Sequence, residues 1–271
     1  MTSSARNRGR IRQPAVAGTF YPGAPTTLRR TTGSLLAGAR QGAATGPRAI
    51  IAPHAGYVYS GPIAAEAFGA VRSLDGAVRR ALVIGPSHYM SFRGIAASSA
   101  TAFSTPLGEL PVEEQAVESI AGLPQIVIDD AAHAPEHALE VELPFLQTVF
   151  GALPIIPLVV GHASGDEVAE ALAQQWDDAT LLVVSSDLSH YHDYATAKRI
   201  DLETAAAIES LDERSIGAGG ACGYLPIRGL LIEAKRRRLA VRRLALLNSG
   251  DTAGDRRSVV GYGAWVFEGH A

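Results

Sequence analysis

The sequence contains a single cysteine, Cys222, and only a small excess of negative charge. One cysteine cannot form a disulfide within the chain, which is typical of proteins from a reducing compartment. The formal net charge of −3 gives no electrostatic reason to expect nucleic acid or an anionic membrane as the main partner. We therefore expect a protein that binds neither of them.

Long apolar runs and nucleotide-binding fingerprints are also missing from the sequence. No stretch approaches the roughly 18 apolar residues of a membrane span, and no apolar segment of a signal peptide follows the early arginines. Neither the G-x-G-x-x-G motif nor a Walker phosphate-binding loop occurs, so we expect no nucleotide cofactor. These absences favour a cytoplasmic location.

Short apolar runs alternate with helix-like segments along the 271 residues, of which 47% are hydrophobic. Runs rich in leucine and β-branched residues are typical of strands that are buried on both faces of a sheet. We predict one α/β domain over residues 13–271, with a mixed, largely parallel central sheet and helices on both faces. Residues 1–12 are small, polar and basic, and are expected to form a disordered arm. The expected strands include 49–53, 81–85, 125–128, 153–161, 180–184, 241–247 and 259–267.

Local signals predict some of the connections between these strands. Ser164 and Glu167 have the spacing of a capping box and predict the start of a helix that ends near residue 176. Residues 94–104 are small or hydroxylated and predict a hairpin or an edge strand. Residues 129–143 are dense in Asp, Glu and His; because a helix tolerates proline only in its first turn, we expect a loop there and a helix over 144–150.

Histidines and an aspartate follow three of the apolar runs directly. His54 comes after the run at 49–53 and His88 after the run at 81–85, while Asp187 and His190 follow the run at 180–184. Ligands of open α/β sheets bind at the carboxyl ends of the strands. We therefore expect these side chains to form the walls of one site.

His54, His88 and Cys222 are candidate ligands of a metal ion with an open coordination position. Imidazole suits iron, copper and zinc, whereas a thiolate favours softer ions over magnesium or calcium. Each histidine, considered alone, could equally be a hydrogen-bonded loop residue, and Cys222 could be a small buried hydrophobic residue.

Asp187 and His190 are candidates for acid–base catalysis, because a carboxylate beside an imidazole raises the pKa of the ring and fixes its tautomer. The alternative is that Ser186 or Asp187 only caps the following turn. Further candidates for the walls of the pocket are one serine, two tyrosines near the histidines and two residues of the charged segment: Ser186, Tyr57, Tyr191, Glu136 and His137. The alternatives are half-buried packing for the tyrosines, which is favoured, and a solvated charged loop for the last two.

Seven segments of the sequence carry a family resemblance: PAVAGTFYP, APHAGYVYSG, GPSH, EHALEVELPFLQ, SSDLSHY, ACGYLP and NSGDTAGDRRSVVGYGAW. In this order, along almost the whole chain, they resemble the Memo family, also called AmmeMemoRadiSam system protein B. The resemblance implies a fold like the catalytic subunit of class III extradiol dioxygenases. It also implies that His54, His88 and Cys222 line the metal pocket, and that His190, supported by Asp187, is the acid–base residue.

The resemblance implies iron or copper as the metal, with zinc as a further option, and leaves three functions open. The first is a metal-dependent oxidoreductase or dioxygenase-like enzyme that acts on an unidentified small molecule. The second is a non-catalytic module that binds a peptide or protein with a vestigial pocket. The third is a metal-free hydrolase with Cys222 as the nucleophile. Family members are also associated with an AMMECR1-like domain and a radical SAM protein, which are the expected partners.

Overall fold

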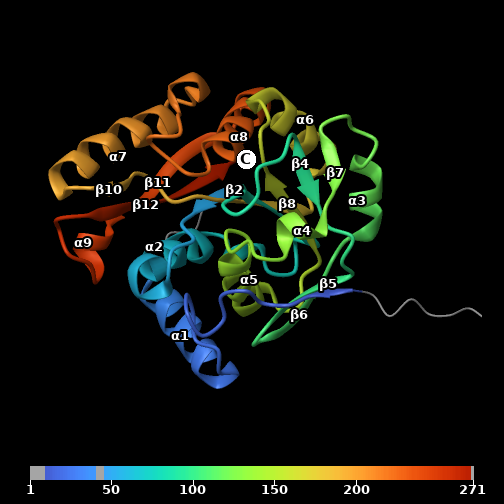
Figure 1. Ribbon diagram of the computed structural model, residues 1–271, viewed down its shortest axis with the longest axis horizontal. Coiled ribbons are helices and arrows are strands. Elements are labelled where there is room, and N and C mark those ends of the chain that lie inside the picture. The colour runs from blue at the N-terminus through green and yellow to red at the C-terminus, as the bar shows by residue number, and fades with distance from the viewer. Residues whose placement is uncertain (1–9, 41–45, 270–271) are drawn as a thin grey trace, which may run out of the picture.

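The structure, a computed structural model, describes residues 10–40 and 46–269 and contains a nine-stranded sheet and a three-stranded sheet (Figure 1). The strands are β1 (Ile11–Arg12), β2 (Pro47–Ala52), β3 (Arg80–Pro86), β4 (Ile95–Ala97), β5 (Ala102–Thr105), β6 (Gly108–Pro111), β7 (Ile126–Ile128), β8 (Ile155–Val160), β9 (Thr180–Ser185), β10 (His190–His192), β11 (Ala240–Asn248) and β12 (Val259–Glu268). The α-helices are α1 (Pro25–Gly38), α2 (Tyr57–Ala70), α3 (Glu114–Ile120), α4 (Asp130–His133), α5 (Leu143–Phe150), α6 (Gly165–Gln175), α7 (Tyr194–Glu209), α8 (Tyr224–Arg236) and α9 (Ser249–Thr252). Short 3-10 turns lie at Arg72–Leu74, Glu140–Glu142 and Glu213–Ser215.

The large sheet has a parallel centre with antiparallel neighbours. Strands β2, β9, β3 and β8 run parallel, in that order, whereas β4 pairs with β8, and β12 pairs with β2, β10 and β11, in antiparallel fashion. The sheet is therefore mixed rather than largely parallel. The segment between β11 and β12 is too short for the crossover that parallel strands need, so these two strands must be antiparallel.

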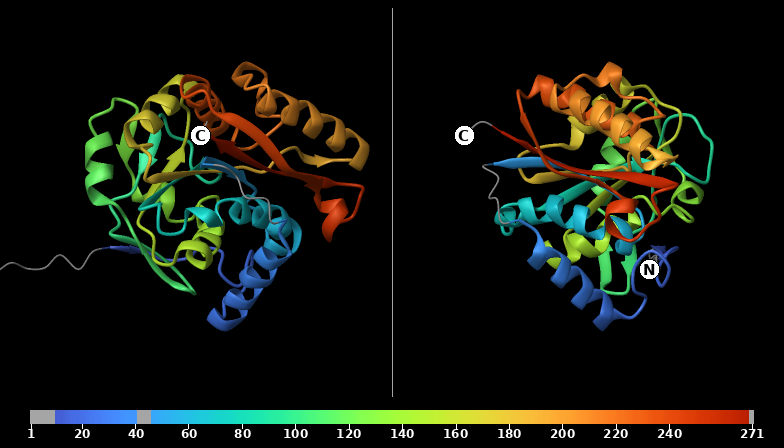
Figure 2. Two further views of the ribbon diagram at one scale, coloured as in Figure 1. Left: turned by 180° about the vertical axis from the view of Figure 1, so that it is seen from behind. Right: turned by 90° about the vertical axis from the view of Figure 1, so that its left-hand side faces the viewer.

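Helices cover both faces of the sheet, as the sequence predicted. Helices α6, α7 and α8 lie on one face, and α1, α2 and α5 lie on the other (Figures 1 and 2). The expected capping box is present at the start of α6, where the Ser164 hydroxyl accepts from the Glu167 amide and the Glu167 carboxylate accepts from the Ser164 amide. None of the helices in the described residues is long and apolar enough to cross a membrane.

Further sequence predictions differ from the structure. Residues 94–104 form neither a hairpin nor an edge strand: β4 lies between β8 and β7 in the large sheet, and β5 lies between β1 and β6 in the small one. Between the two strands, Ser98 and Ser99 both donate to the Asp130 carboxylate, which fixes the chain where it leaves the large sheet. The arm predicted for residues 1–12 falls largely on 1–9, outside the described residues, but its last two residues form β1.

The carboxyl ends of the central strands lie at one edge of the sheet. Ala52 is level with Ser185 across β2 and β9, and Ile84 is level with Val184 across β3 and β9. The isoleucines, valines and leucines of these three strands are fully buried and fix the register. The loops after β2, β3 and β9 therefore begin side by side.

Candidate metal centre

His54, His88 and Cys222 come together at this edge of the sheet. One ligand atom from each lies within 4.8 Å of the other two. The Cys222 Sγ is 3.4 Å from His54 Nε2, and the two imidazole rings cross at 80° with centroids 5.1 Å apart. Around a tetrahedral ion with ordinary bond lengths, such donors lie about 3.3–3.6 Å apart. The group therefore fits a metal ion after a contraction of about 1 Å.

Cys222 reaches the site from the turn that precedes α8. Its backbone N–H donates to the Asp187 carbonyl at 3.2 Å, which ties this turn to the loop after β9. The next residue, Gly223, packs directly on Ser186, and a Cβ there would lie 2.7 Å from the Ser186 side chain. A glycine is required at this position because any larger residue would push the thiol away from the histidines.

The His54 ring is fixed by Ser185, the last residue of β9. His54 Nδ1 lies 2.8 Å from Ser185 Oγ, and the Ser185 hydroxyl donates to the Ala138 carbonyl at 2.7 Å. Because the hydroxyl proton is used there, His54 Nδ1 is the donor to Ser185. The tautomer follows from this assignment: Nε2 carries no proton and faces Cys222 with a free lone pair.

Glu142 lies behind Ser185, with one carboxyl oxygen 2.8 Å from Ser185 Oγ and the other without a hydrogen-bond partner. Complete burial raises the pKa of Glu142 well above its usual value, which favours the protonated, neutral carboxyl. A protonated carboxyl can supply the hydrogen of the contact with Ser185. This places an uncharged group behind the histidine.

The His88 ring is held by Glu136. The Glu136 carboxylate accepts from the His88 backbone N–H at 2.6 Å and lies 2.8 Å from His88 Nδ1. It also accepts from the amides of His137 and Ala138, at 2.9 Å each. Because the carboxylate can only accept, Nδ1 carries the proton and Nε2 is free, as in a carboxylate–histidine–metal arrangement.

His88, Glu136 and His137 form a second group with metal-binding spacing. The Glu136 oxygens already accept four hydrogen bonds, three of them from backbone amides. Binding an ion there would break the contact that fixes His88. We therefore assign Glu136 to positioning, and His137 to the wall of the pocket, where its ring stacks on His88 with centroids 4.6 Å apart.

Burial favours the uncharged forms of His54, His137 and Cys222. It lowers the pKa of His54 well below its usual value, and the neighbouring histidines add to the effect. Burial also lowers the pKa of His137 to about 4 and raises the pKa of the Cys222 thiol to about 12, with Asp187 as a further cause. Neutral imidazoles are ready to coordinate, whereas the thiol needs a cation nearby before it can ionise.

Asp187 and His190 lie at the site but are not hydrogen-bonded to each other in the described residues. His190 Nδ1 donates to the Leu188 carbonyl at 2.8 Å, and the Asp187 carboxyl accepts from the His54 backbone N–H at 2.9 Å. The two side chains do not share a helical turn, because His190 begins the extended strand β10. Asp187 thus positions the His54 loop, and burial raises its pKa to about 7.

The remaining candidates have different surroundings. Ser186 is buried, and its hydroxyl donates to the Asp187 carbonyl and accepts from the Gly223 amide. Tyr57 is buried in α2 and donates to the Val141 carbonyl, which is the packing role of a core residue. Tyr191 is 78% exposed, has a positive φ of 61° and lies edge-on to the His190 ring.

Sequence reasoning missed Ser185 and Glu142. Ser185 could not be singled out from the sequence, because its contact with His54 depends on the register between β2 and β9. Glu142 lies in a motif whose charged residues suggested a solvated loop, yet it is fully buried. The available signal was the recurrence of Glu136, Glu140 and Glu142, four and two positions apart, within an otherwise apolar motif.

The sequence of residues 12–266 matches the model of the family described as Memo-like protein. A MEMO1 family protein from Aeropyrum pernix is 38% identical over 280 aligned positions, which cover 94% of this chain and 99% of that one. A MEMO1 family protein from Thermotoga maritima is 35% identical, and the alignment covers 93% of this chain and 97% of that one. One from Nitrosopumilus maritimus is 32% identical, and the alignment covers 95% of this chain and 99% of that one.

Among solved structures, an uncharacterized protein, JW3007 from Escherichia coli K12, has a similar fold. Its crystal structure matches with a TM-score of 0.54 over 80% of this chain and 98% of that chain. The sequences are 14% identical, so the likeness concerns the fold alone.

Proposed function

The chain belongs to the Memo-like family, and we propose that it is a metal-dependent oxidoreductase that binds iron or copper through His54, His88 and Cys222. The observation that carries the proposal is the approach of the Cys222 sulfur to a histidine nitrogen that carries no proton, at 3.4 Å. Nitrogen and sulfur donors favour iron, copper or zinc over magnesium and calcium. Of these three, iron and copper change oxidation state.

The side chains around the three candidate ligands suit redox chemistry that is coupled to proton transfer. A bound iron or copper ion would supply redox chemistry at its open position. His190 is half-buried and uses Nδ1 to bind the Leu188 carbonyl, so its Nε2 remains free to take or give a proton. Burial lowers the pKa of His190, which favours the neutral ring that a general base requires.

A metal-free hydrolase is disfavoured by the thiol. A cysteine nucleophile must be a thiolate near neutral pH, but burial raises the pKa of Cys222 to about 12. The neighbouring His54 cannot stabilise the anion as a cation, because burial also lowers its own pKa. The high pKa of the thiol therefore argues against a metal-free hydrolase with Cys222 as the nucleophile.

Metal content tests the proposal directly. Protein purified without oxygen should contain about one iron or copper ion per chain, measured by elemental analysis. His54→Ala and Cys222→Ser should lose most of this metal, and should also lose oxygen uptake in a screen of catechols and thiols. His162→Ala is a matched control, because that ring is exposed and bonded to Ser91. Equal metal content in all four proteins would refute the assignment.

A binding role is the second candidate, and exposed aromatic residues favour it. Tyr89 and Tyr191 are 55% and 78% exposed, and their rings lie edge-on to His137 and His190, respectively. Such rings could hold a small molecule or peptide over the site. Partner binding that survives His54→Ala together with His88→Ala would support this role. The AMMECR1-like and radical SAM partners stay a prediction, which co-purification from the native host would test.

A further inference from the structure

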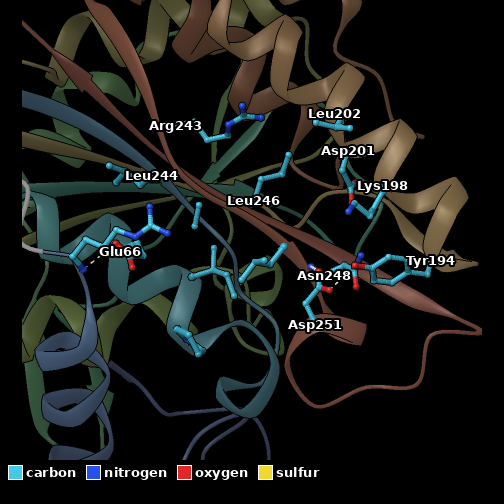
Figure 3. A pocket seen from close by; sticks show the side chains of 15 residues that line it. Glu66, Tyr194, Lys198, Asp201, Leu202, Arg243, Leu244, Leu246, Asn248 and Asp251 are labelled. Carbon is cyan, nitrogen blue, oxygen red and sulfur yellow. Dashed lines mark hydrogen bonds between the residues drawn. The ribbon is translucent and has the colours of Figure 1, made fainter.

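A groove lies on the far side of the sheet's edge strand β11, away from the metal centre. It has a volume of about 680 Å³ and is bounded by α2 on one side and α7 on the other (Figure 3). Its floor is the second half of β11, residues 244–248. We call it the β11 groove. A strand edge between two helices leaves room for one further strand.

The β11 edge has no strand partner within the described residues. β11 is nine residues long, pairs with β12 on one side only, and is mostly exposed or half-buried. At the opposite edge of the sheet, β7 has only three residues. Long open edges present unpaired N–H and C=O groups and are templates for pairing with another chain. A β-bulge between Arg243 and Ala245 interrupts the pairing with β12, so β11 is regular over residues 245–248.

Exposed leucines mark the same place. Leu202 of α7 and Leu247 of β11 are the only exposed leucines among the described residues, at 51% and 42%, and both line the β11 groove. Leu202 also borders a second hollow on the outer face of α7, together with Ala195 and Ala206. An apolar centre with a charged rim is the usual composition of a protein interface.

The charges of the groove suit a second copy of this chain. The groove is lined by three cationic and three anionic side chains: Arg40, Lys198, Arg243, Glu66, Asp201 and Asp251. A partner whose charges are all of one sign would therefore not be attracted to the groove as a whole. Arg243 lies towards one end of the groove and Asp251 at the other (Figure 3). An antiparallel pairing about the middle of β11 would bring the arginine end of each copy to the aspartate end of the other.

We propose that this protein forms a two-fold dimer in which the β11 strands of two copies pair antiparallel and continue the sheet. Strand edges are self-complementary in this arrangement, as a two-fold interface requires. The α7 helices would pack across the interface on one face and the α2 helices on the other. Leu202 and Leu247 become buried when the dimer forms, which accounts for their exposure in the single chain.

Sedimentation equilibrium of the full chain tests the dimer. The wild type should be dimeric at about 100 µM, well above the Kd of even a weak dimer. Leu202→Asp and Leu247→Asp should each raise the dissociation constant by tenfold or more. Ile128→Asp is the matched control, because Ile128 is a similarly exposed residue, 49%, on the edge strand β7. Its dissociation constant should equal that of the wild type.

Hydrogen exchange gives a second readout that does not need a variant. The amides of residues 244–248 should exchange more slowly as the protein concentration rises, whereas those of β7 should not change. A wild type that is monomeric at about 100 µM overturns the proposal and assigns the groove to a different chain or a small ligand. A dimer that only Ile128→Asp dissociates, or that neither leucine substitution weakens, overturns it as well.

Discussion

Glu136 accepts both the backbone N–H and the ring Nδ1–H of His88, at 2.6 and 2.8 Å. One carboxylate therefore fixes the position of the loop and the tautomer of the ring. Because Nδ1 of His88 is bonded to Glu136, Nε2 is the nitrogen that remains available to a metal ion. The tautomer of His54 is fixed in a similar way, by the neutral hydroxyl of Ser185.

Glu136→Gln should weaken metal binding about 10- to 100-fold, as is typical when a positioning carboxylate is lost. The amide of glutamine has only one acceptor oxygen and cannot replace both contacts. Affinity can be measured by competition with a chromophoric chelator. Glu109→Gln, at an exposed position of β6, is the control. An affinity within twofold of the wild type would mean that Glu136 does not set the His88 tautomer.

Cys222 should resist alkylation in the metal-free protein. Its pKa of about 12 means that iodoacetamide labels it slowly at pH 8, while the same thiol in urea-unfolded protein reacts at the normal rate. Metal binding at pH 7 should release about one proton, because coordination requires the thiolate. Calorimetry in two buffers of different ionisation enthalpy measures this release. Rapid labelling of folded protein, or no proton release, would contradict the raised pKa.

The buried His133 should make stability depend on pH. Its Nε2 donates to the Ala96 carbonyl, and burial lowers the pKa of the ring from 6.5 to about 4. The unfolded chain takes up this proton at higher pH than the folded one, so stability is complete above pH 6.5 and falls as the pH drops towards 4. The contribution is about 3 kcal/mol between pH 7 and pH 4.

His133→Gln isolates this effect, because the glutamine amide can keep the bond to the Ala96 carbonyl without titrating. Urea unfolding of both proteins at pH 7 and pH 4 gives the two differences in free energy. The loss on acidification should be smaller in the variant. Identical losses would show that His133 titrates normally.

Arg12 should contribute more to stability than its place near the start of the chain suggests. Its guanidinium is buried and forms an ion pair with the fully buried Glu140. Arg12→Ala leaves this carboxylate without its cation and should cost about 3–5 kcal/mol in the free energy of unfolding. Arg199→Ala removes an exposed i,i+4 pair with Glu203 and should cost less than about 0.5 kcal/mol. Similar losses in the two variants would contradict the prediction.

The main features of the fold follow from local patterns in the sequence. The apolar runs before His54, His88 and Asp187 predicted buried strands, and parallel pairing explains why their loops meet. The family motifs added Cys222 to the same pocket. These features are readable because the burial pattern and the order of elements are encoded within short segments.

The supporting contacts could not be read from the sequence. Glu136 and Ser185 act through bonds that depend on how loops and strands far apart in the chain lie against each other. For Tyr57, three positions after His54, the sequence left a pocket role and packing open, and packing applies because α2 begins at this tyrosine and turns its ring into the core. The antiparallel pairs of β12 with β2 and of β4 with β8 join segments that lie far apart in the chain, so local patterns do not predict them.

Strands β3, β8 and β9, at the parallel centre of the sheet, are buried along almost their whole length. Ser185 and Glu136 orient the imidazoles without help from a cation, so the scaffold stands whether or not the pocket is filled. Loading and unloading should leave the fold of the chain intact, with the bound ion only adding stability, whereas a zinc finger unfolds without its ion. Such a pocket can exchange its occupant repeatedly during the lifetime of one molecule.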